Sequence, residues 1–353
     1  MKLSAIARTV AVAALAGGLA VAMSTSSEAQ GKRIKWKMAS TFPGKLVQLG
    51  TGGKRFEALI KKISGGNIQM KFFEPGALVP AFGVFDAVQA GSVDAGWSAS
   101  GYWVGKIPAA IWFTTVPFGP RGSEYLAWLE FGGGQELWDE IYAKQGLKAV
   151  PCGLLAPEAS GWFRKEIKSV EDLKGLKMRF FGLGAQVMQK MGVSTQLLAG
   201  GDIFPALERG TIDATEFSQP AIDLKLGFYQ VAKHYYFPGW HQQSSILELL
   251  MNKGKWDALT DQQQTQIKTA CGDNIQYMLA EGEAIQLPAL KELQSKGVKI
   301  HRWPDSFLAQ LKEKWEEVLA EQSAKDADFK RVAESLNAFR AEYGKWKNLI
   351  YLQ

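Results

Sequence analysis

Residues 85–95 read Phe-Asp-Ala-Val-Gln-Ala-Gly-Ser-Val-Asp-Ala, and residues 204–214 read Phe-Pro-Ala-Leu-Glu-Arg-Gly-Thr-Ile-Asp-Ala. The two stretches share phenylalanine, alanine, glycine, a β-branched residue, aspartate and alanine at a constant offset of 119 positions. Each is typical of a short helix that a glycine ends, followed at once by a buried strand. The repeat therefore predicts two lobes of like topology, with the segments that follow the two strands, 96–103 and 215–220, facing a shared crevice.

Strand-like and helix-like segments alternate around the first copy of this repeat. Residues 32–39 and 68–73 alternate polar and apolar side chains, as half-buried strands do. Residues 45–64 between them carry apolar side chains at helical spacing and end at glycines. We therefore expect an α/β fold with a largely parallel sheet. The C-terminal third is predicted to be mostly helical, over residues 261–287, 306–324 and 326–343.

Length and composition limit the class of protein. The 353 residues suffice for two domains of ordinary size, and a content of 46% apolar and 22% charged residues is that of a globular protein. The formal net charge of +6 is mild and does not indicate a nucleic-acid binder.

The first 29 residues have the pattern of an export signal. Lys2 and Arg8 precede an apolar run over 10–23, which is too short to span a bilayer comfortably. Ser27 and Ala29 then form a small-x-small cleavage site. We expect cleavage after Ala29 and export of the mature chain, with an uncleaved anchor as the alternative.

Export bears on the two cysteines, Cys152 and Cys271, which could pair in an oxidising compartment. One follows an apolar run and the other lies in a predicted helix. Two separate buried thiols are the simpler interpretation, and the one that the sequence favours.

Catalytic motifs are missing from the sequence. The three histidines, His234, His241 and His301, have no zinc-binding spacing, and neither a nucleophile elbow nor a phosphate-binding loop is present. An exported chain without such a constellation is more readily a binding protein than an enzyme.

Three longer motifs carry a resemblance to a known family. Residues 171–179, Glu-Asp-Leu-Lys-Gly-Leu-Lys-Met-Arg, and residues 199–216 resemble two signatures of the extracytoplasmic solute receptors of tripartite ATP-independent periplasmic (TRAP) transporters, the DctP type. Residues 225–240, from Lys-Leu-Gly-Phe-Tyr to Pro-Gly-Trp, resemble the branch that binds 2-oxo and 2-hydroxy monocarboxylates. The resemblance covers essentially the whole mature chain. It implies a periplasmic protein with a ligand cleft between two lobes.

This resemblance and the repeat together predict the domain organisation. The signal peptide, 1–29, is followed by lobe I over 30–152, to which part of 243–290 returns. Lobe II covers 153–242, and the C-terminal helices within 291–353 pack across both lobes.

The resemblance also implies the binding site. Arg179 matches the position that holds the substrate carboxylate, for which a guanidinium fork is suited. Glu216 and Phe217 match a pair that ligates a cation through a side chain and a backbone carbonyl, with Gln242 as a further ligand. The substrate is expected to contact Arg179, Glu158, Phe217, Tyr102 and Trp103.

Two departures from the branch affect the cation. Glu158 stands where the branch often has Gln, and Gln242 stands where it often has Glu, so the number of carboxylates is unchanged. Hard oxygen donors with no cysteine or histidine nearby predict Na⁺ or Ca²⁺ bound together with the substrate. Ca²⁺ is expected if Glu158 is a ligand, and Na⁺ if Glu158 takes a substrate hydroxyl instead. Leu154, in place of an asparagine, leaves the identity of the substrate open.

The predicted function is capture of a small 2-oxo or 2-hydroxy monocarboxylate for a TRAP transporter, whose membrane subunits are the expected partners. A binding protein of an ATP-driven importer, for another small anion or a sugar, is the alternative; a secreted α/β enzyme is less favoured.

Relatives with an exchangeable C-terminal arm extend past the final helix, whereas this chain stops at Gln353. We therefore expect a monomer, with a dimer as the alternative.

Overall fold

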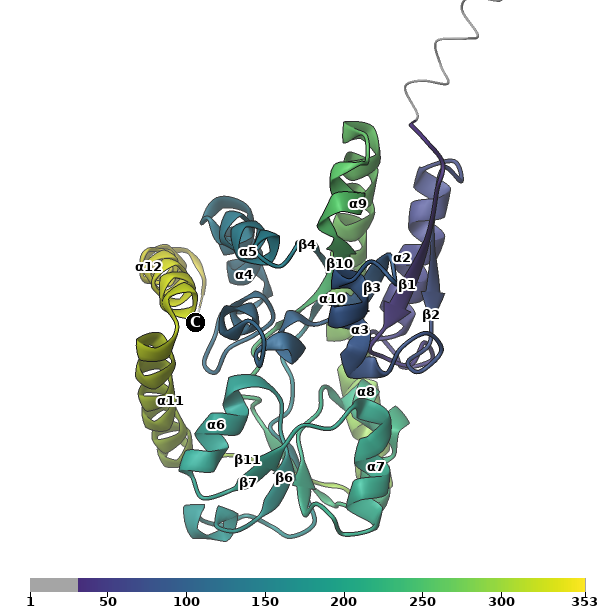
Figure 1. Ribbon diagram of the computed structural model, residues 1–353. Helices are drawn as coiled ribbons and strands as arrows, with labels where there is room; N and C mark the ends of the chain where they lie inside the picture. Colours follow the sequence, from purple (N-terminus) through teal and green to yellow (C-terminus); the bar gives the residue numbers. More distant parts are fainter. Residues whose placement is uncertain (1–30, 353) are drawn as a thin grey trace, which may run out of the picture.

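The structure, a computed structural model, describes residues 31–352 and consists of two lobes, each built on its own sheet. The expected export signal, 1–29, lies outside the described residues. In Figure 1 one lobe lies above the other, with the C-terminal helices along one side of both. No helix in the described part of the chain is both long and apolar enough to cross a membrane.

The first sheet has the strand order β2-β1-β3-β10-β4. Strand β1 runs parallel to both β2 and β3, whereas β10 is antiparallel to β3 and to β4. The expected strands at 32–39 and 68–73 are thus observed as β1 and β2. The strands of this sheet are β1 (Ile34–Ser40), β2 (Ile68–Phe73), β3 (Ala95–Ser98), β4 (Leu147–Leu155) and β10 (Ser245–Asn252).

The second sheet has the order β11-β9-β5-β8-β6-β7. Strand β6 is parallel to β7 and β8, and β5 is antiparallel to β8 and β9. Its strands are β5 (Gly161–Phe163), β6 (Lys177–Arg179), β7 (Ser194–Gln196), β8 (Ala214–Thr215), β9 (His234–Phe237) and β11 (Lys299–Arg302).

Both sheets are therefore mixed, and the expectation of a largely parallel sheet was wrong for the strands that follow a crossing between the lobes. Strand β5 comes after the crossing at 156–160, and β10 comes after the crossing at 238–244. Each enters its sheet from the side of the other lobe, while the parallel strands beside it end on that side. This reverses its direction relative to its neighbours.

The repeated motif has the same structure in both lobes. Helices α3 (Val84–Gln89) and α7 (Gly200–Glu208) are followed by Gly91 with φ 72° and Gly210 with φ 71°. Left-handed backbone at these angles favours glycine, which explains the shared residue. The next strands, β3 and β8, lie parallel to β1 and β6. The repeat is thus a structural one, with one copy in each lobe.

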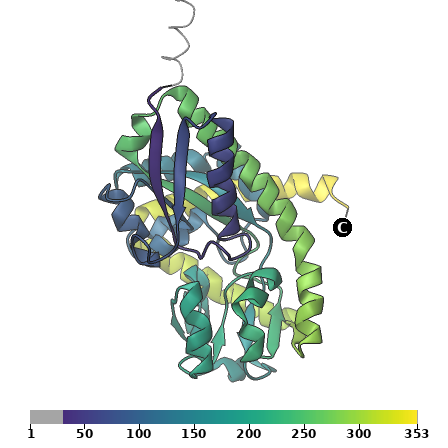
Figure 2. The same ribbon diagram turned by 90° about the vertical axis from the view of Figure 1, so that its right-hand side faces the viewer.

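Helices cover the outer faces of the sheets and connect the lobes. Helix α10 runs along both lobes in Figure 2: the Gln48 side chain of the first lobe donates to the Met278 carbonyl, and Gln286 donates to Gln219 of the second lobe. Helix α11 packs beside α6, and α12 beside α4 and α5. The helices not yet given are α2 (Thr51–Ile63), α4 (Gly122–Phe131), α5 (Gly134–Ala143), α6 (Gly182–Lys190), α8 (Pro220–Leu226), α9 (Lys253–Asp257), α10 (Asp261–Ser295), α11 (Asp305–Lys325) and α12 (Ala327–Ile350).

Cys152 of β4 and Cys271 of α10 form a disulfide bond, so the favoured interpretation of two separate thiols was wrong. Helix α10 packs on β4 and brings the two Cα atoms to 4.2 Å from each other. This packing joins residues 119 positions apart. Local sequence pattern carries no information on such a contact.

Candidate functional site

A small buried cavity lies between the two lobes, where the carboxyl ends of parallel strands meet. Its volume of ≈ 30 Å³ has room for about two water molecules. Its wall is mostly apolar, with a few polar side chains. The lining residues are Phe42, Leu49, Ala99, Tyr102, Thr114, Leu155, Glu158, Arg179, Phe181, Phe217, Ser218, Gln242, Ser245 and Leu247.

Arg179 ends strand β6 and is the only lysine or arginine among the described residues of this wall. Its side chain is 1% exposed. Nη1 donates to the Glu216 carbonyl at 2.6 Å and to Glu216 Oε2 at 2.8 Å, and Nε donates to the Leu198 carbonyl at 3.2 Å. These contacts use the hydrogens of Nε and Nη1. Nη2 is the guanidinium nitrogen that makes none of these contacts.

Glu216 follows strand β8, next to Arg179 at the ends of two neighbouring parallel strands. Its Oε2 also accepts from the Phe181 backbone N–H at 3.0 Å. Burial alone would raise the pKa of this carboxyl, but Arg179, His241 and the Phe181 N–H together hold the pKa below its ordinary value. Glu216 is therefore an ionised carboxylate, and its Oε2 is paired with Arg179.

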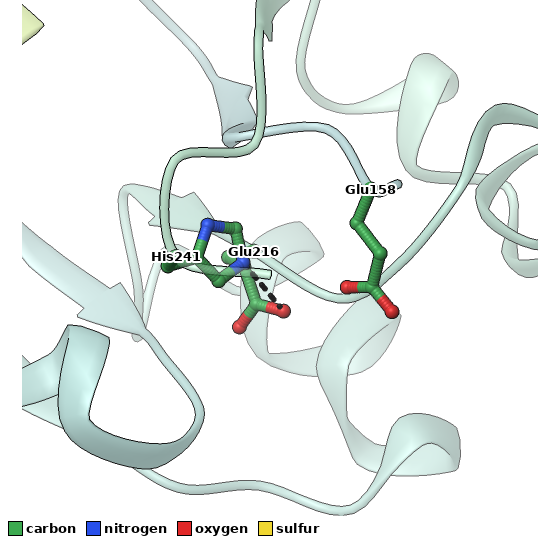
Figure 3. A group of neighbouring side chains, drawn as sticks. All are labelled: Glu158, Glu216 and His241. Atoms are coloured by element: carbon green, nitrogen blue, oxygen red, sulfur yellow. Dashed lines mark ion pairs between the residues drawn. The ribbon is translucent and has the colours of Figure 1, made fainter. Parts of the chain in front are cut away.

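Glu158 lies on the segment that crosses from β4 to β5 and lines the cavity, whereas Glu216 and His241 are not among its lining residues. Figure 3 shows the Glu158 side chain to the right of Glu216. Ser218 Oγ donates to its Oε1 at 3.1 Å, and Oε2 has no partner among the described residues. Burial, and then the negative charge of Glu216, raise the pKa of Glu158 well above its ordinary value. A nearby cation would reverse this effect and keep Glu158 ionised.

Two aromatic residues of the expected site line the cavity, and one does not. The Arg179 guanidinium lies 5.1 Å from the centroid of the Phe217 ring, and the Tyr102 ring lies 4.8 Å from that of Phe181 across the lobes. Trp103 is instead buried in the first lobe, where its indole N–H donates to Glu248 at 2.6 Å. Tyr102 and Trp103 share a short 3₁₀ turn that points neighbouring side chains in different directions. The expectation that Trp103 contacts the substrate is therefore corrected.

Gln242 lines the cavity from the crossing between β9 and β10. Its Nε2 donates to Ser245 Oγ at 2.7 Å, while Oε1 has no partner in the described part of the chain. Leu155, not Leu154, lines the wall, because alternate residues of β4 face opposite sides of the sheet.

His241 is the residue that sequence reasoning missed. Figure 3 shows its ring beside Glu216, and its Nε2 lies 3.4 Å from Glu216 Oε1. The prediction that no histidine lies near the oxygen donors was therefore wrong. The sequence signal that could have indicated His241 is its position directly before Gln242, a predicted site residue. The strand-end rule would also have indicated Phe42 and Phe181, which follow β1 and β6.

The residues present fit a cation. Glu158 Oε2, Glu216 Oε1 and Gln242 Oε1 are buried acceptors without a partner among the described residues, and such atoms are costly to leave unpaired. One ligand atom from each of Glu158, Glu216 and His241 lies within 4.8 Å of the others. Two carboxylates and an amide oxygen suit a hard cation.

Comparison with known proteins agrees with this arrangement. The family profile for bacterial extracellular solute-binding protein, family 7 (DctP), matches residues 40–326. This chain belongs to the DctP family. The predicted resemblance to TRAP solute receptors is confirmed, and the members of the family are solute-binding proteins.

A curated relative of this DctP protein is the monocarboxylate 2-oxoacid-binding periplasmic protein of Nostoc sp. The two are 37% identical over 99% of this chain and 96% of the relative.

Solved structures of the family confirm the two-lobed fold and show bound cations. A TRAP transporter solute-binding protein from Bordetella bronchiseptica, a mixed-occupancy dimer with copurified calcium and picolinate, is 33% identical, with a TM-score of 0.88 over 91% of this chain and 95% of that one. A protein from Colwellia psychrerythraea with calcium and pyruvate is 34% identical, with a TM-score of 0.86 over 90% and 98% of the two chains. One from Pseudoalteromonas atlantica with sodium and pyruvate is also 34% identical, with a TM-score of 0.86 over 90% and 97%. Na⁺ or Ca²⁺ is thus bound together with an organic acid in homologues of this DctP protein.

Proposed function

We propose that this DctP protein captures a small 2-oxo or 2-hydroxy monocarboxylate in the periplasm, together with a cation, and delivers it to the membrane subunits of a TRAP transporter. The observation that carries the proposal is the buried Arg179 at the cavity, whose Nη2 is left for a ligand while Glu216 holds the rest of the guanidinium. The names of the Nostoc relative and of the pyruvate-bound structures support the same class of ligand.

The lining of the cavity supports a monocarboxylate rather than a dicarboxylate or a sugar. Arg179 supplies the only positive side chain among the described lining residues, so a second ligand carboxylate would find no second arginine or lysine there. Rings and aliphatic chains form most of the remaining wall, which suits a short apolar tail. The small volume favours an acid of pyruvate or lactate size over a hexose.

Na⁺ or Ca²⁺ is the proposed companion of the acid, with Glu216, the Phe217 carbonyl and Gln242 as ligands. If Glu158 also ligates, the two carboxylates and the substrate carboxylate exceed the charge of Arg179 by two, which Ca²⁺ balances. If Glu158 instead accepts a substrate hydroxyl, Na⁺ fits the smaller excess. One homologue binds calcium with pyruvate and another binds sodium with pyruvate, which supports a site for either cation.

Melting temperatures across a library of small acids test the function. We expect pyruvate, lactate and branched 2-oxo acids to raise the melting temperature, because a ligand that binds only the folded state stabilises it. Sugars, amino acids and dicarboxylates serve as the comparison set. Shifts only with sugars or amino acids would favour the binding protein of an ATP-driven importer and overturn the proposal. No reaction is proposed.

We expect the lobes to close on the ligand about the crossings at 156–160 and 238–244. Tyr102 and Phe181 line the cavity and contact each other from opposite lobes, so separation of the lobes would widen the cavity. Small-angle scattering should give a larger radius of gyration without pyruvate than with a saturating amount. A radius of gyration that saturating pyruvate leaves unchanged would contradict a closing cleft.

The protein is expected to be a monomer, although the last turns of α12 expose apolar side chains through which a dimer could form. Sedimentation velocity at micromolar concentration should give a single species of monomer mass. A stable dimer at that concentration would overturn the expectation, and the apolar surface at the C-terminus would then be the first to mutate. The exposed residues of this surface are Trp346, Leu349, Ile350, Tyr351 and Leu352.

A further inference from the structure

His241 is a buried histidine whose Nδ1 has no hydrogen-bond partner among the described residues, and whose Nε2 has only Glu216 Oε1 beside it. Its side chain is 1% exposed. The ring packs edge-on against Phe180, with centroids 4.9 Å apart, and against Trp240 at 5.5 Å. These two neighbours fix the ring in a position where Nε2 faces Glu216 Oε1 at 3.4 Å.

Such an arrangement is unfavourable unless a further group completes it. A buried polar group without a partner destabilises a protein by about 1–3 kcal/mol. Here Glu158 Oε2 and Glu216 Oε1 lack partners as well, and the three side chains converge within 4.8 Å (Figure 3). A cation placed among the three side chains would give each of them a partner.

The donor set selects among cations. Ca²⁺ takes oxygen ligands, whereas imidazole is a preferred ligand of zinc and other transition metals. Zn²⁺ accepts both imidazole nitrogen and carboxylate oxygen, and a zinc site with three protein ligands leaves a position open for a substrate oxygen. Relatives whose sites hold oxygen donors alone would lack this preference.

We propose that His241 gives the cation site of this protein a nitrogen ligand, so that the site prefers a transition-metal dication such as Zn²⁺ or Co²⁺ to Ca²⁺ or Na⁺. This inference rests on the co-bound cation of the proposed function, but it replaces Na⁺ or Ca²⁺ with a transition-metal dication. Glu158 and Glu216 supply the charge, and Arg179 on the far side of Glu216 keeps the second oxygen of that carboxylate away from the metal.

Metal titrations of the full mature chain, stripped with a chelator, test the inference. Calorimetry would give the affinities for Zn²⁺ and Ca²⁺ with pyruvate present, and the visible absorption of bound Co²⁺ would report a nitrogen ligand. We expect Zn²⁺ to bind at least about tenfold more tightly than Ca²⁺. His241→Phe, which keeps an aromatic ring against Phe180 and Trp240, should lower the ratio of Zn²⁺ to Ca²⁺ affinity by about tenfold or more and change the Co²⁺ spectrum.

His301→Gln is the matched control, because His301 lies on β11 beside His234 and away from the cavity. It should keep the wild-type ratio. His241→Gln serves if His241→Phe does not fold. A ratio that neither His241 variant changes, or a wild-type preference for Ca²⁺, would overturn this inference and leave the proposed function standing. Pyruvate binding that no cation affects would instead remove the cation from the proposed function, and this inference with it.

Discussion

Replacing Arg179 with alanine should lower the affinity for pyruvate by tens to thousands of fold. The side chain is 1% exposed and is the only cation on the described wall of the cavity. Truncating one partner of a buried charge pair costs about 2–5 kcal/mol, which sets this range. Calorimetry with pyruvate, in a buffer that holds the cation constant, measures the loss.

The same substitution should also destabilise the protein without ligand. Arg179 neutralises Glu216 inside the protein, and an unpaired buried carboxylate costs about 3–5 kcal/mol of folding stability. The melting temperature of each variant must therefore be measured beside its affinity. Arg179→Lys keeps the charge but cannot donate to the Glu216 carbonyl, to Oε2 and to a ligand in the fixed geometry of the guanidinium. We expect it to fold more stably than Arg179→Ala and to bind nearly as weakly.

Arg209→Ala is the matched control for both variants. Arg209 lies in the second lobe, just after α7, and is exposed. Its removal should leave both affinity and melting temperature close to the wild-type values. Pyruvate affinity of a folded Arg179→Ala protein within a factor of two of wild type would remove Arg179 from the site.

Sequence reasoning could predict the site residues that lie at the ends of strands. Arg179 ends one strand-like segment and Glu216 follows another, and the repeated motif locates the strand that precedes Glu216. That β6 and β8 are neighbours, with Arg179 opposite Thr215, is a property of the sheet order, which depends on contacts between distant segments. The family resemblance assigned both residues to one site, but it did not predict the ion pair between them.

The features that sequence reasoning missed also depend on contacts between segments that are distant in sequence. The disulfide requires α10 to lie on β4, and each of the antiparallel strands β5 and β10 requires the chain to cross between the lobes just before it. Trp103 was assigned to the site together with Tyr102, yet the 3₁₀ turn that holds both residues buries Trp103 in the first lobe. His241 was left out of the predicted site although it adjoins Gln242. In an irregular segment such as this one, two consecutive side chains can face the same side, which alternation in a strand does not predict.

Glu216→Gln should be the second large effect, because it removes the carboxylate at which the ion pair and the cation site meet. Glutamine keeps the size of the side chain and an oxygen for Arg179, but it loses the charge that would bind a cation. We expect pyruvate affinity to fall by tens to thousands of fold, and the dependence of binding on added cation to disappear. Glu208→Gln, an exposed carboxylate at the end of α7, is the matched control and should behave as wild type.

Chelation of the wild-type protein separates the two roles of Glu216. If the carboxylate holds a cation, removing divalent ions and sodium should weaken pyruvate binding by about tenfold or more, and adding the cation back should restore it. If it serves only as the counter-ion of Arg179, wild-type affinity will be the same with chelator, with Na⁺ and with Ca²⁺. Glu216→Gln should still lose stability, because the charge of Arg179 is then buried without a counter-charge. That second pattern would eliminate the co-bound cation and leave Glu216 as the group that aims Arg179 Nη2 at the ligand.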